Sequence, residues 1–137
     1  MTSTLVDTNI LIDVLGPESA TRTWSVVQLA RVSDAGRVVV NQVIYGELAA
    51  GFTRETVHQV LDAAGVKRDS LSFDAAWQAG AAHGAYRRAG GARVRTLPDF
   101  LIGAQAVREG HALLTRDPTR YRTYFPELSI VAPDTHP

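Results

Sequence analysis

The stretch Leu5-Val6-Asp7-Thr8-Asn9-Ile10-Leu11-Ile12-Asp13 places a carboxylate where an apolar strand gives way to a helix. In an open α/β sheet, ligands bind beyond the carboxyl ends of the strands, so an acid directly after the first strand points into that crevice. An Asp before Thr and Asn also starts helices, because its oxygen accepts a free backbone N–H. Taken alone, the stretch favours the helix cap. A functional interpretation of Asp7 depends on further acids at comparable places.

The length and composition set the outer limits. At 137 residues the chain is long enough for one domain with one core, so we expect residues 1–137 to form a single domain with a frayed tail over 133–137. The absence of cysteine excludes disulfides and thiolate chemistry and fits a reducing compartment. The first apolar run has no basic region before it and soon meets Asp7 and Asp13. We therefore expect no signal peptide, no membrane span and a cytoplasmic location.

The charge is zero overall but is unevenly spread. Between positions 87 and 122, eight basic residues stand against three acidic ones, which suggests a basic surface suited to a polyanion. A solvated charged face is the commoner explanation of such a run. The segment from Arg87 to Arg95, which includes Arg93, is our hypothesis for the surface that contacts such a polyanion. The basic residues are Arg87, Arg88, Arg93, Arg95, Arg108, Arg116, Arg120 and Arg122, and the acids are Asp99, Glu109 and Asp117.

Apolar periodicity predicts alternating strands and helices, which implies an α/β protein with a parallel sheet. Trp24 and Trp77 are expected in the core. Gly80 and Gly84 are spaced so that another helix can approach closely, either within the fold or across a dimer. Strands are expected over 4–7, 37–41, 71–73, 112–115 and 128–131, and helices over 9–15, 19–33, 42–51, 53–64, 74–88 and from 98 onward, with a short helix or turn over 121–125.

Three more acids follow strands or open helices. Glu47 lies about 40° from Val43 on its helix, so we expect its carboxylate on the packed side, paired with an Arg or a cation. Pro98 starts a helix with Asp99 in its first turn, and Gly103 is expected to leave open space above that carboxylate. Asp117 precedes a proline, which by itself is most simply a helix cap.

Right-handed crossovers bring Asp7, Glu47, Asp99 and Asp117 to the same edge of a parallel sheet. Four carboxylates in one place repel each other unless protons or a hard divalent cation offset their charge. Mg²⁺ prefers oxygen ligands, and it can activate a water and neutralise charge on a phosphodiester. The pattern therefore favours metal-dependent hydrolysis over a nucleophilic side chain.

Four motifs occur in order along the chain: L-V-D-T-N-I-L-I-D at 5–13, E-L-x-x-G at 47–51, P-D-F-L-I-G-A-x-A at 98–106 and T-R-D at 115–117. With these motifs the chain resembles the PIN-domain nucleases, and more closely the VapC-type toxins of prokaryotic type II toxin–antitoxin systems. The resemblance implies a PIN-like three-layer α/β/α sandwich with a central parallel sheet. It also implies an endoribonuclease dependent on Mg²⁺ or Mn²⁺, inhibited by a VapB-type antitoxin, and a homodimer.

The resemblance also implies roles for single residues. The catalytic acids are Asp7, Glu47, Asp99 and Asp117, of which Asp7 and Asp99 bind metal most directly. The other two acids complete the site through waters or a second ion. The residues assigned to orient the site or bind substrate are Asn9, Thr115 and Arg116, together with Arg93 and Arg95 from the basic segment. Gln105 and Thr119 depart from the family pattern: they stand where many relatives have His and where some carry another acid, and the second departure leaves the number of ions open.

Two other classes of function remain as alternatives. One is phosphoryl transfer on Asp7. Haloacid-dehalogenase-like phosphatases need a second Asp where Asn9 stands, and response-regulator receivers need a late Lys, whereas Lys67 is the only lysine. In a non-catalytic binding module, the acids would serve only as caps. Binding of a divalent cation discriminates the nuclease from this last class.

Overall fold

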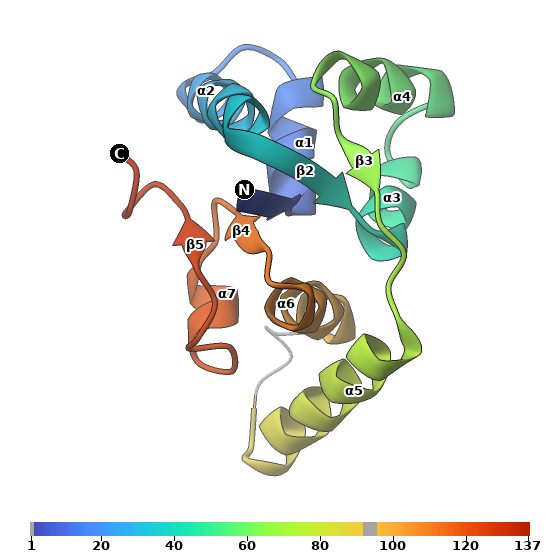
Figure 1. The fold of residues 1–137 in the computed structure, drawn as a ribbon, viewed down its shortest axis with the longest axis vertical. Helices are drawn as coiled ribbons and strands as arrows, with labels where there is room; N and C mark the ends of the chain where they lie inside the picture. Colours follow the sequence, from blue (N-terminus) through green and yellow to red (C-terminus); the bar gives the residue numbers. More distant parts are fainter. Residues whose placement is uncertain (1, 92–95) are drawn as a thin grey trace.

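The computed structural model describes residues 2–91 and 96–137. Its strands form one parallel sheet in the order β3-β2-β1-β4-β5 (Figure 1), which confirms the predicted α/β class. β1 is central, and its fully buried Leu5 lies opposite Val39 on one side and Leu113 on the other. The strands are β1 Thr2–Val6, β2 Gly36–Val40, β3 Lys67–Arg68, β4 Ala112–Leu114 and β5 Ile130–Val131.

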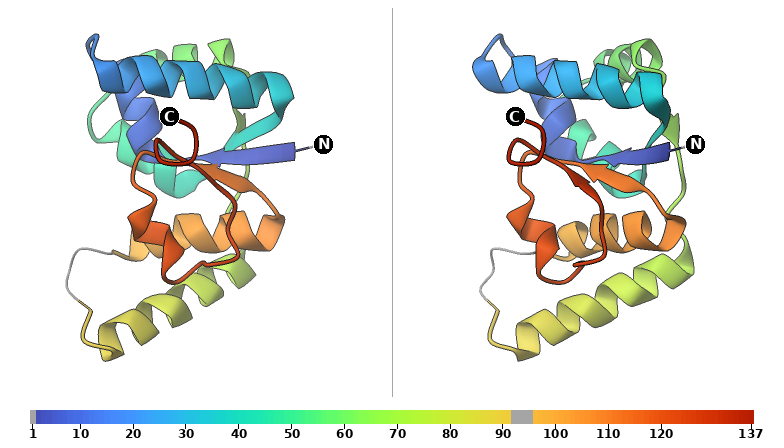
Figure 2. Two further views of the ribbon diagram at one scale, coloured as in Figure 1. Left: turned by 90° about the vertical axis from the view of Figure 1, so that its left-hand side faces the viewer. Right: turned by 60° about the vertical axis from the view of Figure 1, so that its left-hand side comes forward.

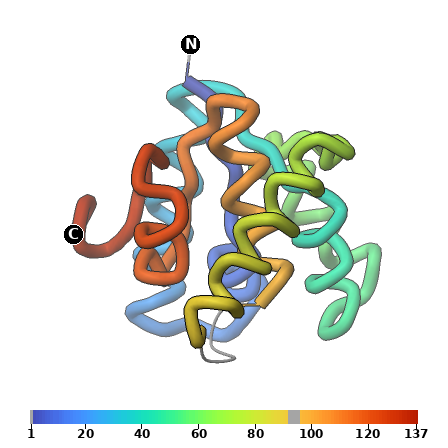
Figure 3. Tube along the Cα trace, turned by 90° about the horizontal axis from the view of Figure 1, so that it is seen from below, coloured from blue at the N-terminus to red at the C-terminus, as the bar shows by residue number. Residues whose placement is uncertain are grey.

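Helices cover both faces of the sheet, as the three-layer prediction requires. α1, α2 and α4 lie on one face and α6 on the other, with α5 packed against the outer side of α6 (Figure 2). From the α5 side, α7 and the C-terminal segment lie across α6 from α3 and α4 (Figure 3). The helices are α1 Thr8–Leu15, α2 Ala20–Ala35, α3 Gln42–Ala49, α4 Arg54–Ala63, α5 Phe73–Arg88, α6 Leu97–Glu109 and α7 Thr119–Arg122.

Side-chain caps define where several helices begin. Ser19 accepts a hydrogen bond from the third residue of its helix, Thr53 does the same for α4 and Ser72 for α5. These caps satisfy backbone N–H groups that the first helical turn leaves without a partner. The predicted starts at Ser19 and Thr53 are confirmed. No helix in the described part of the chain is long and apolar enough to cross a membrane.

The strand predicted over 71–73 is wrong. The strand in this part of the chain is instead β3, Lys67–Arg68, which pairs with Val39 and Val40 at one edge of the sheet. Both of its residues are exposed, so no apolar run marks it in the sequence. Charged side chains on an edge strand discourage pairing with other chains. Phe73, the last residue of the predicted strand, opens α5 and is 96% exposed.

The structure corrects the expectation for one of the two tryptophans and narrows the alternatives for Gly80. Trp77 is 82% exposed, so it does not belong to the core. Trp24 is half-buried and packs against the core as expected, and its indole donates a hydrogen bond to the backbone oxygen of His136 at 2.7 Å. A side chain added at Gly80 would meet no atom within 4 Å, so this glycine does not admit another helix of the fold.

The C-terminal segment makes contacts that a frayed tail would lack. Besides the bond from Trp24 to His136, Asp134 forms an ion pair with Arg122 at 2.7 Å. The Thr135 hydroxyl donates to the backbone oxygen of Ala132 at 3.0 Å. Residues 133–137 therefore lie against α2 and α7. That residues 1–137 form one domain stays a prediction.

The sheet order fixes where a site can form. The chain leaves β1 for β2 on one side and later returns to β4 on the other, so the strand order reverses between β1 and β4. In open α/β sheets, ligands bind at the carboxyl ends of strands at such a switch point. Asp7 follows β1 and Thr115 follows β4, and the Asp7 backbone N–H donates to the backbone oxygen of Leu114 at 2.9 Å.

Candidate active site

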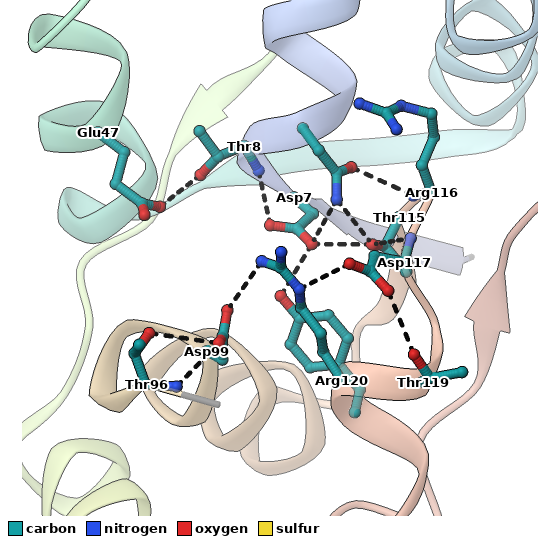
Figure 4. Close-up of polar contacts among 12 residues, drawn as sticks. Asp7, Thr8, Glu47, Thr96, Asp99, Thr115, Arg116, Asp117, Thr119 and Arg120 are labelled. Carbon is teal, nitrogen blue, oxygen red and sulfur yellow. Dashed lines mark hydrogen bonds and ion pairs between the residues drawn. The ribbon is translucent and has the colours of Figure 1, made fainter. Parts of the chain in front are cut away.

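Asp7 lies at the end of β1 and caps α1. The residue is 4% exposed. Oδ1 accepts a hydrogen bond from the backbone N–H of Thr8 at 2.7 Å, which is the cap interaction. Oδ2 accepts bonds from the side chains of Asn9, Thr115 and Tyr121 at 3.3, 2.8 and 2.8 Å (Figure 4). Asp7 is thus both a helix cap and the centre of a polar network at the switch point.

Burial raises the pKa of the Asp7 carboxyl above its ordinary value of 3.8. Hydrogen bonds from Tyr121 and Thr115 oppose this shift in the pKa, and the negative charge of Asp99 adds to it. Tyr121 is fully buried, and burial together with the charge of Asp7 raises the pKa of its phenol, so the hydroxyl remains a donor. All four donors to Asp7 are neutral. A bound divalent cation would supply the opposite charge that they do not.

Asp99 lies in the first turn of α6, as predicted, and is 8% exposed. Its Oδ2 accepts bonds from the backbone N–H and the hydroxyl of Thr96 at 3.0 and 3.3 Å. Its Oδ1 faces Arg120, whose Nη1 lies 3.5 Å away. One oxygen therefore serves the helix cap and the other faces the acids.

The open space predicted above Asp99 at Gly103 is filled. A Cβ built on Gly103 would lie 2.4 Å from the ring of Phe125. This glycine is required because the aromatic ring packs directly on the backbone of α6. It supports the segment that follows α7 and leaves no room for a ligand.

Glu47 is exposed, contrary to the expectation of a packed carboxylate. Its Oε1 accepts a hydrogen bond from the Thr8 hydroxyl at 2.6 Å (Figure 4). The helical period places Glu47 beside apolar neighbours, but the described residues leave that side of α3 exposed at this position. The carboxylate still points toward the N-terminus of α1, next to Asp7.

Asp117, from the segment after β4, is the last of the four acids that we call the acidic edge: Asp7, Glu47, Asp99 and Asp117. Its side chain is 40% exposed, and its Oδ2 lies 2.7 Å from Nε of Arg120. Its Oδ1 accepts a bond from the Thr119 hydroxyl at 3.2 Å. The carboxylate thus makes side-chain contacts, and the cap that the Asp-Pro sequence suggests is not what holds it. Arg120 therefore connects Asp117 with Asp99.

Thr115 and Asn9 hold the network around Asp7 together. Thr115 is fully buried, and its hydroxyl also accepts the backbone N–H of Asp117 at 3.0 Å. The amide of Asn9 donates to Thr115 at 3.3 Å and accepts the backbone N–H of Arg116 at 3.1 Å. These bonds link the loop after β4 to α1 and fix the direction of the Asp7 carboxylate. Both residues therefore lie where an orienting role requires them.

Arg116 does not face the acids with its side chain. Its guanidinium binds Asp13 on α1, whose carboxylate also accepts the Ser25 hydroxyl at 2.6 Å. The contribution of Arg116 to the site runs through its backbone N–H. Arg93 and Arg95 lie outside the described residues.

Ion pairs with acids of the same chain occupy much of the basic segment. Arg108 pairs with Asp74 at 3.2 Å and Arg122 pairs with Asp134 at 2.7 Å. Each of these pairs reduces the positive charge that the surface presents to a polyanion. The local excess in the sequence therefore overstates the basic character of this side of the protein.

Three residues of the site lack a distinctive sequence signal: Thr8, Arg120 and Tyr121. Tyr121 appears from sequence to be a packing residue, yet its hydroxyl binds Asp7. A buried tyrosine hydroxyl needs a partner, but no local pattern around Tyr121 identifies Asp7, 114 residues earlier, as that partner. The contacts of Arg120 with the acids require α7 to lie beside α6, and the contact of Thr8 with Glu47 requires α3 to lie beside α1.

The donor chemistry of this edge fits a hard divalent cation. Asp7 and Asp99 are nearly buried carboxylates that repel each other, and oxygen is the ligand that Mg²⁺ prefers. Within 2–91 and 96–137, no three acidic or imidazole groups converge into a ready-made cluster. Mg²⁺ needs no such cluster, because it usually takes one or two carboxylates together with waters and substrate phosphate oxygens.

Comparison with known proteins identifies the family. The PIN-domain family model matches residues 4–126. Ribonuclease VapC11 of Mycobacterium tuberculosis is 31% identical over 117 residues, which cover 82% of this chain and 85% of the relative. The VapC ribonuclease Mb1587 of Mycobacterium bovis matches with the same identity and coverage.

Solved structures agree with the fold. VapBC2 from Rickettsia felis, bound to a DNA fragment of its promoter, superposes with a TM-score of 0.71 at 16% identity and covers 96% of this chain and 98% of that one. DNA-bound VapBC from Salmonella typhimurium gives 0.69 at 17% identity with the same coverage. The chain belongs to the PIN-domain family, in its group of VapC ribonucleases.

Proposed function

We propose that this chain is the toxin of a type II toxin–antitoxin pair and hydrolyses RNA phosphodiester bonds with Mg²⁺ or Mn²⁺. The burial of Asp7 at the switch point, with Asp99 near enough to raise the pKa of its carboxyl, carries this proposal. Two nearly buried carboxylates that repel each other are costly unless a proton or a cation joins them. Membership among VapC ribonucleases supports RNA as the substrate.

Each acid has a distinct part in the proposed reaction. Asp7 and Asp99 would hold the cation, while the exposed Glu47 and half-exposed Asp117 would position waters around it. When bound, the cation supplies an activated water and neutralises charge on the scissile phosphate. Asn9 and Thr115 keep the Asp7 carboxylate in one direction, which preserves the alignment that hydrolysis needs.

A cognate antitoxin is the proposed regulator. The solved neighbours from Rickettsia felis and Salmonella typhimurium are VapBC assemblies, which supports a partner of this kind. The cytoplasmic location stays a prediction, and it agrees with an RNA substrate and a protein inhibitor. Contacts of RNA with Arg93 and Arg95 also stay a prediction.

We also propose that the protein forms a homodimer through the outer face of α5. Phe73 and Trp77 are exposed at the N-terminal half of this face, and Gly80 and Gly84 follow in the C-terminal half. In an antiparallel pair about a two-fold axis near Gly80, the aromatic half of one copy meets the small half of the other. The same pairing would place Asp74, which also pairs with Arg108 of its own chain, near Arg87 of the second copy.

The structure bears on the alternative of phosphoryl transfer on Asp7. A nucleophilic carboxylate needs an oxygen that is free to attack, but both oxygens of Asp7 accept hydrogen bonds and the residue is 4% exposed. A non-catalytic module remains the second candidate, because Asp7 and Asp99 are indeed caps.

Cleavage of total cellular RNA by the purified chain tests the proposal. We expect discrete products with Mg²⁺, none with chelator, and none from Asp7→Asn or Asp99→Asn. Glu109→Gln, an exposed acid at the opposite end of α6 from Asp99, serves as the control and should cleave like wild type. A wild-type protein that is free of antitoxin and cuts nothing in Mg²⁺ or Mn²⁺ would favour the binding module.

A further inference from the structure

Arg120 occupies an unusual place among the acids. Its Nε lies 2.7 Å from Oδ2 of Asp117, and its Nη1 lies 3.5 Å from Oδ1 of Asp99. Figure 4 shows the guanidinium between these two carboxylates, on the side that Asp7 faces. Among the ion pairs of the described residues, no other basic side chain joins two of the four acids.

The contact with Asp99 uses the oxygen that a cation would need. Oδ2 of Asp99 is held by both donors of Thr96, so Oδ1 is the oxygen directed away from the cap. Arg120 lies on this Oδ1. A cation that binds there meets a positive charge that is already in place.

The surroundings of Arg120 allow its side chain to leave. Its backbone is anchored because the next residue, Tyr121, is fully buried and bonded to Asp7. Its own side chain is 43% exposed. Burial lowers the pKa of Arg120, but the charges of Asp99 and Asp117 outweigh this effect and raise the pKa. The guanidinium is therefore charged, and among the described residues its ion pairs are those with Asp99 and Asp117, so it can turn outward without unfolding α7.

We propose that Arg120 is a built-in counter-ion that competes with the divalent cation for Asp99 and so sets the metal affinity of the site. This inference rests on the proposed function. The guanidinium neutralises the acidic edge in the metal-free protein, which avoids repulsion between Asp99 and Asp117. Metal binding releases it toward solvent, on the side from which a polyanion must approach.

Calorimetric titration of Mn²⁺ into metal-free protein without RNA tests this competition. Arg120→Gln should bind Mn²⁺ more tightly than wild type, on the order of fivefold, because two partly exposed ion pairs no longer oppose the metal. Arg120→Lys keeps the charge but cannot bridge both acids in the same way, so its affinity should lie between the two. Arg122→Gln, on the same helix but paired with Asp134, should match wild type.

The outcomes separate this inference from the proposed function. Equal or weaker Mn²⁺ binding by Arg120→Gln, with wild type binding Mn²⁺ and cutting RNA, overturns the competition and leaves the nuclease intact. If Arg120→Lys binds as tightly as Arg120→Gln, the charge is not responsible and the competition is also overturned. Binding by Arg120→Gln alone supports it in its strongest form. If no variant binds Mn²⁺ and wild type cuts no RNA, both proposals fail.

Discussion

Two carboxylates of the acidic edge, Asp7 and Asp117, are held in opposite ways. Asp7 is nearly buried and is fixed by neutral donors, among them Thr115 and Tyr121. Asp117 is half-exposed and is held by the charged Arg120. Neutral donors orient a carboxylate without cancelling its charge, whereas a guanidinium cancels the charge and must move aside for a metal. The buried Asp7 thus has a fixed orientation, whereas the contact of Asp117 with Arg120 can exchange for a contact with a metal.

Replacing Asp7 should have the largest effect, with opposite signs on activity and stability. Asp7→Asn removes a proposed metal ligand, so RNA cleavage should fall by at least about 100-fold. The same change removes a buried charge, so the variant should melt at or above the temperature of wild type at neutral pH. Cleavage assays and thermal unfolding of both proteins check this. A clearly lower melting temperature with full activity would contradict the role of Asp7 as a buried, charged metal ligand.

The pH dependence of that stability gain follows from the pKa shift. Burial places the folded-state pKa of Asp7 above its ordinary 3.8, so the folded protein holds this proton more tightly than the unfolded chain. The resulting stabilisation is complete below the ordinary pKa and is lost as pH rises through the folded pKa. The melting-temperature advantage of Asp7→Asn should therefore be absent at low pH and appear as pH rises. A pH-independent difference would show that Asp7 is not buried as a titrating group.

Tyr121→Phe should weaken the hydrogen-bond network around Asp7 without removing an acid. Loss of its hydroxyl leaves Asp7 Oδ2 with fewer donors, which should cost about 1 to 3 kcal/mol of unfolding free energy. A displaced ligand orientation should lower RNA cleavage by about 10-fold or more. Denaturant unfolding and cleavage rates measure the two effects. Tyr124→Phe, in the aromatic cluster with Tyr86 and Phe100, is the matched control and should keep full activity.

The smallest effect on cleavage is expected far from the acidic edge, on α5. Trp77→Ser should shift the protein from dimer to monomer while cleavage per chain stays within about twofold, because the proposed contact buries Trp77 and none of the four site acids. Light scattering after gel filtration reads the mass. Val27→Ser, at a 55% exposed apolar position on α2, should leave the mass unchanged. A monomeric wild type, or a Trp77→Ser dimer, would remove α5 from the interface.

Much of the fold follows from local sequence signals. The apolar runs ending at Val6 and Val40 mark buried strands, and Ser19 and Thr53 mark helix starts, because these signals act within a few residues. The two charged residues of β3 carry no such signal, since an edge strand needs only backbone pairing with β2. The strand could therefore be recognised only from the assembled sheet.

The candidate site divides in the same way. The places of Asp7 and Asp99 follow from where a strand ends and where a proline starts a helix. The exposure of Glu47 depends on whether another element covers its side of α3, which helical periodicity does not report. The bridge made by Arg120 requires α6 and α7 to lie together, and the space at Gly103 is taken by Phe125 from a distant segment. These features are tertiary, so local sequence patterns do not contain them.

Binding of Mn²⁺ to wild type and Asp7→Asn, measured by calorimetry without RNA, tests the central claim most directly. The account predicts that wild type binds Mn²⁺ and that Asp7→Asn binds it at least about 10-fold more weakly, since the carboxylate at the switch point is the best-oriented ligand of the edge. Equal binding by the two proteins would show that Asp7 does not hold the cation, and would contradict the site described for this PIN domain.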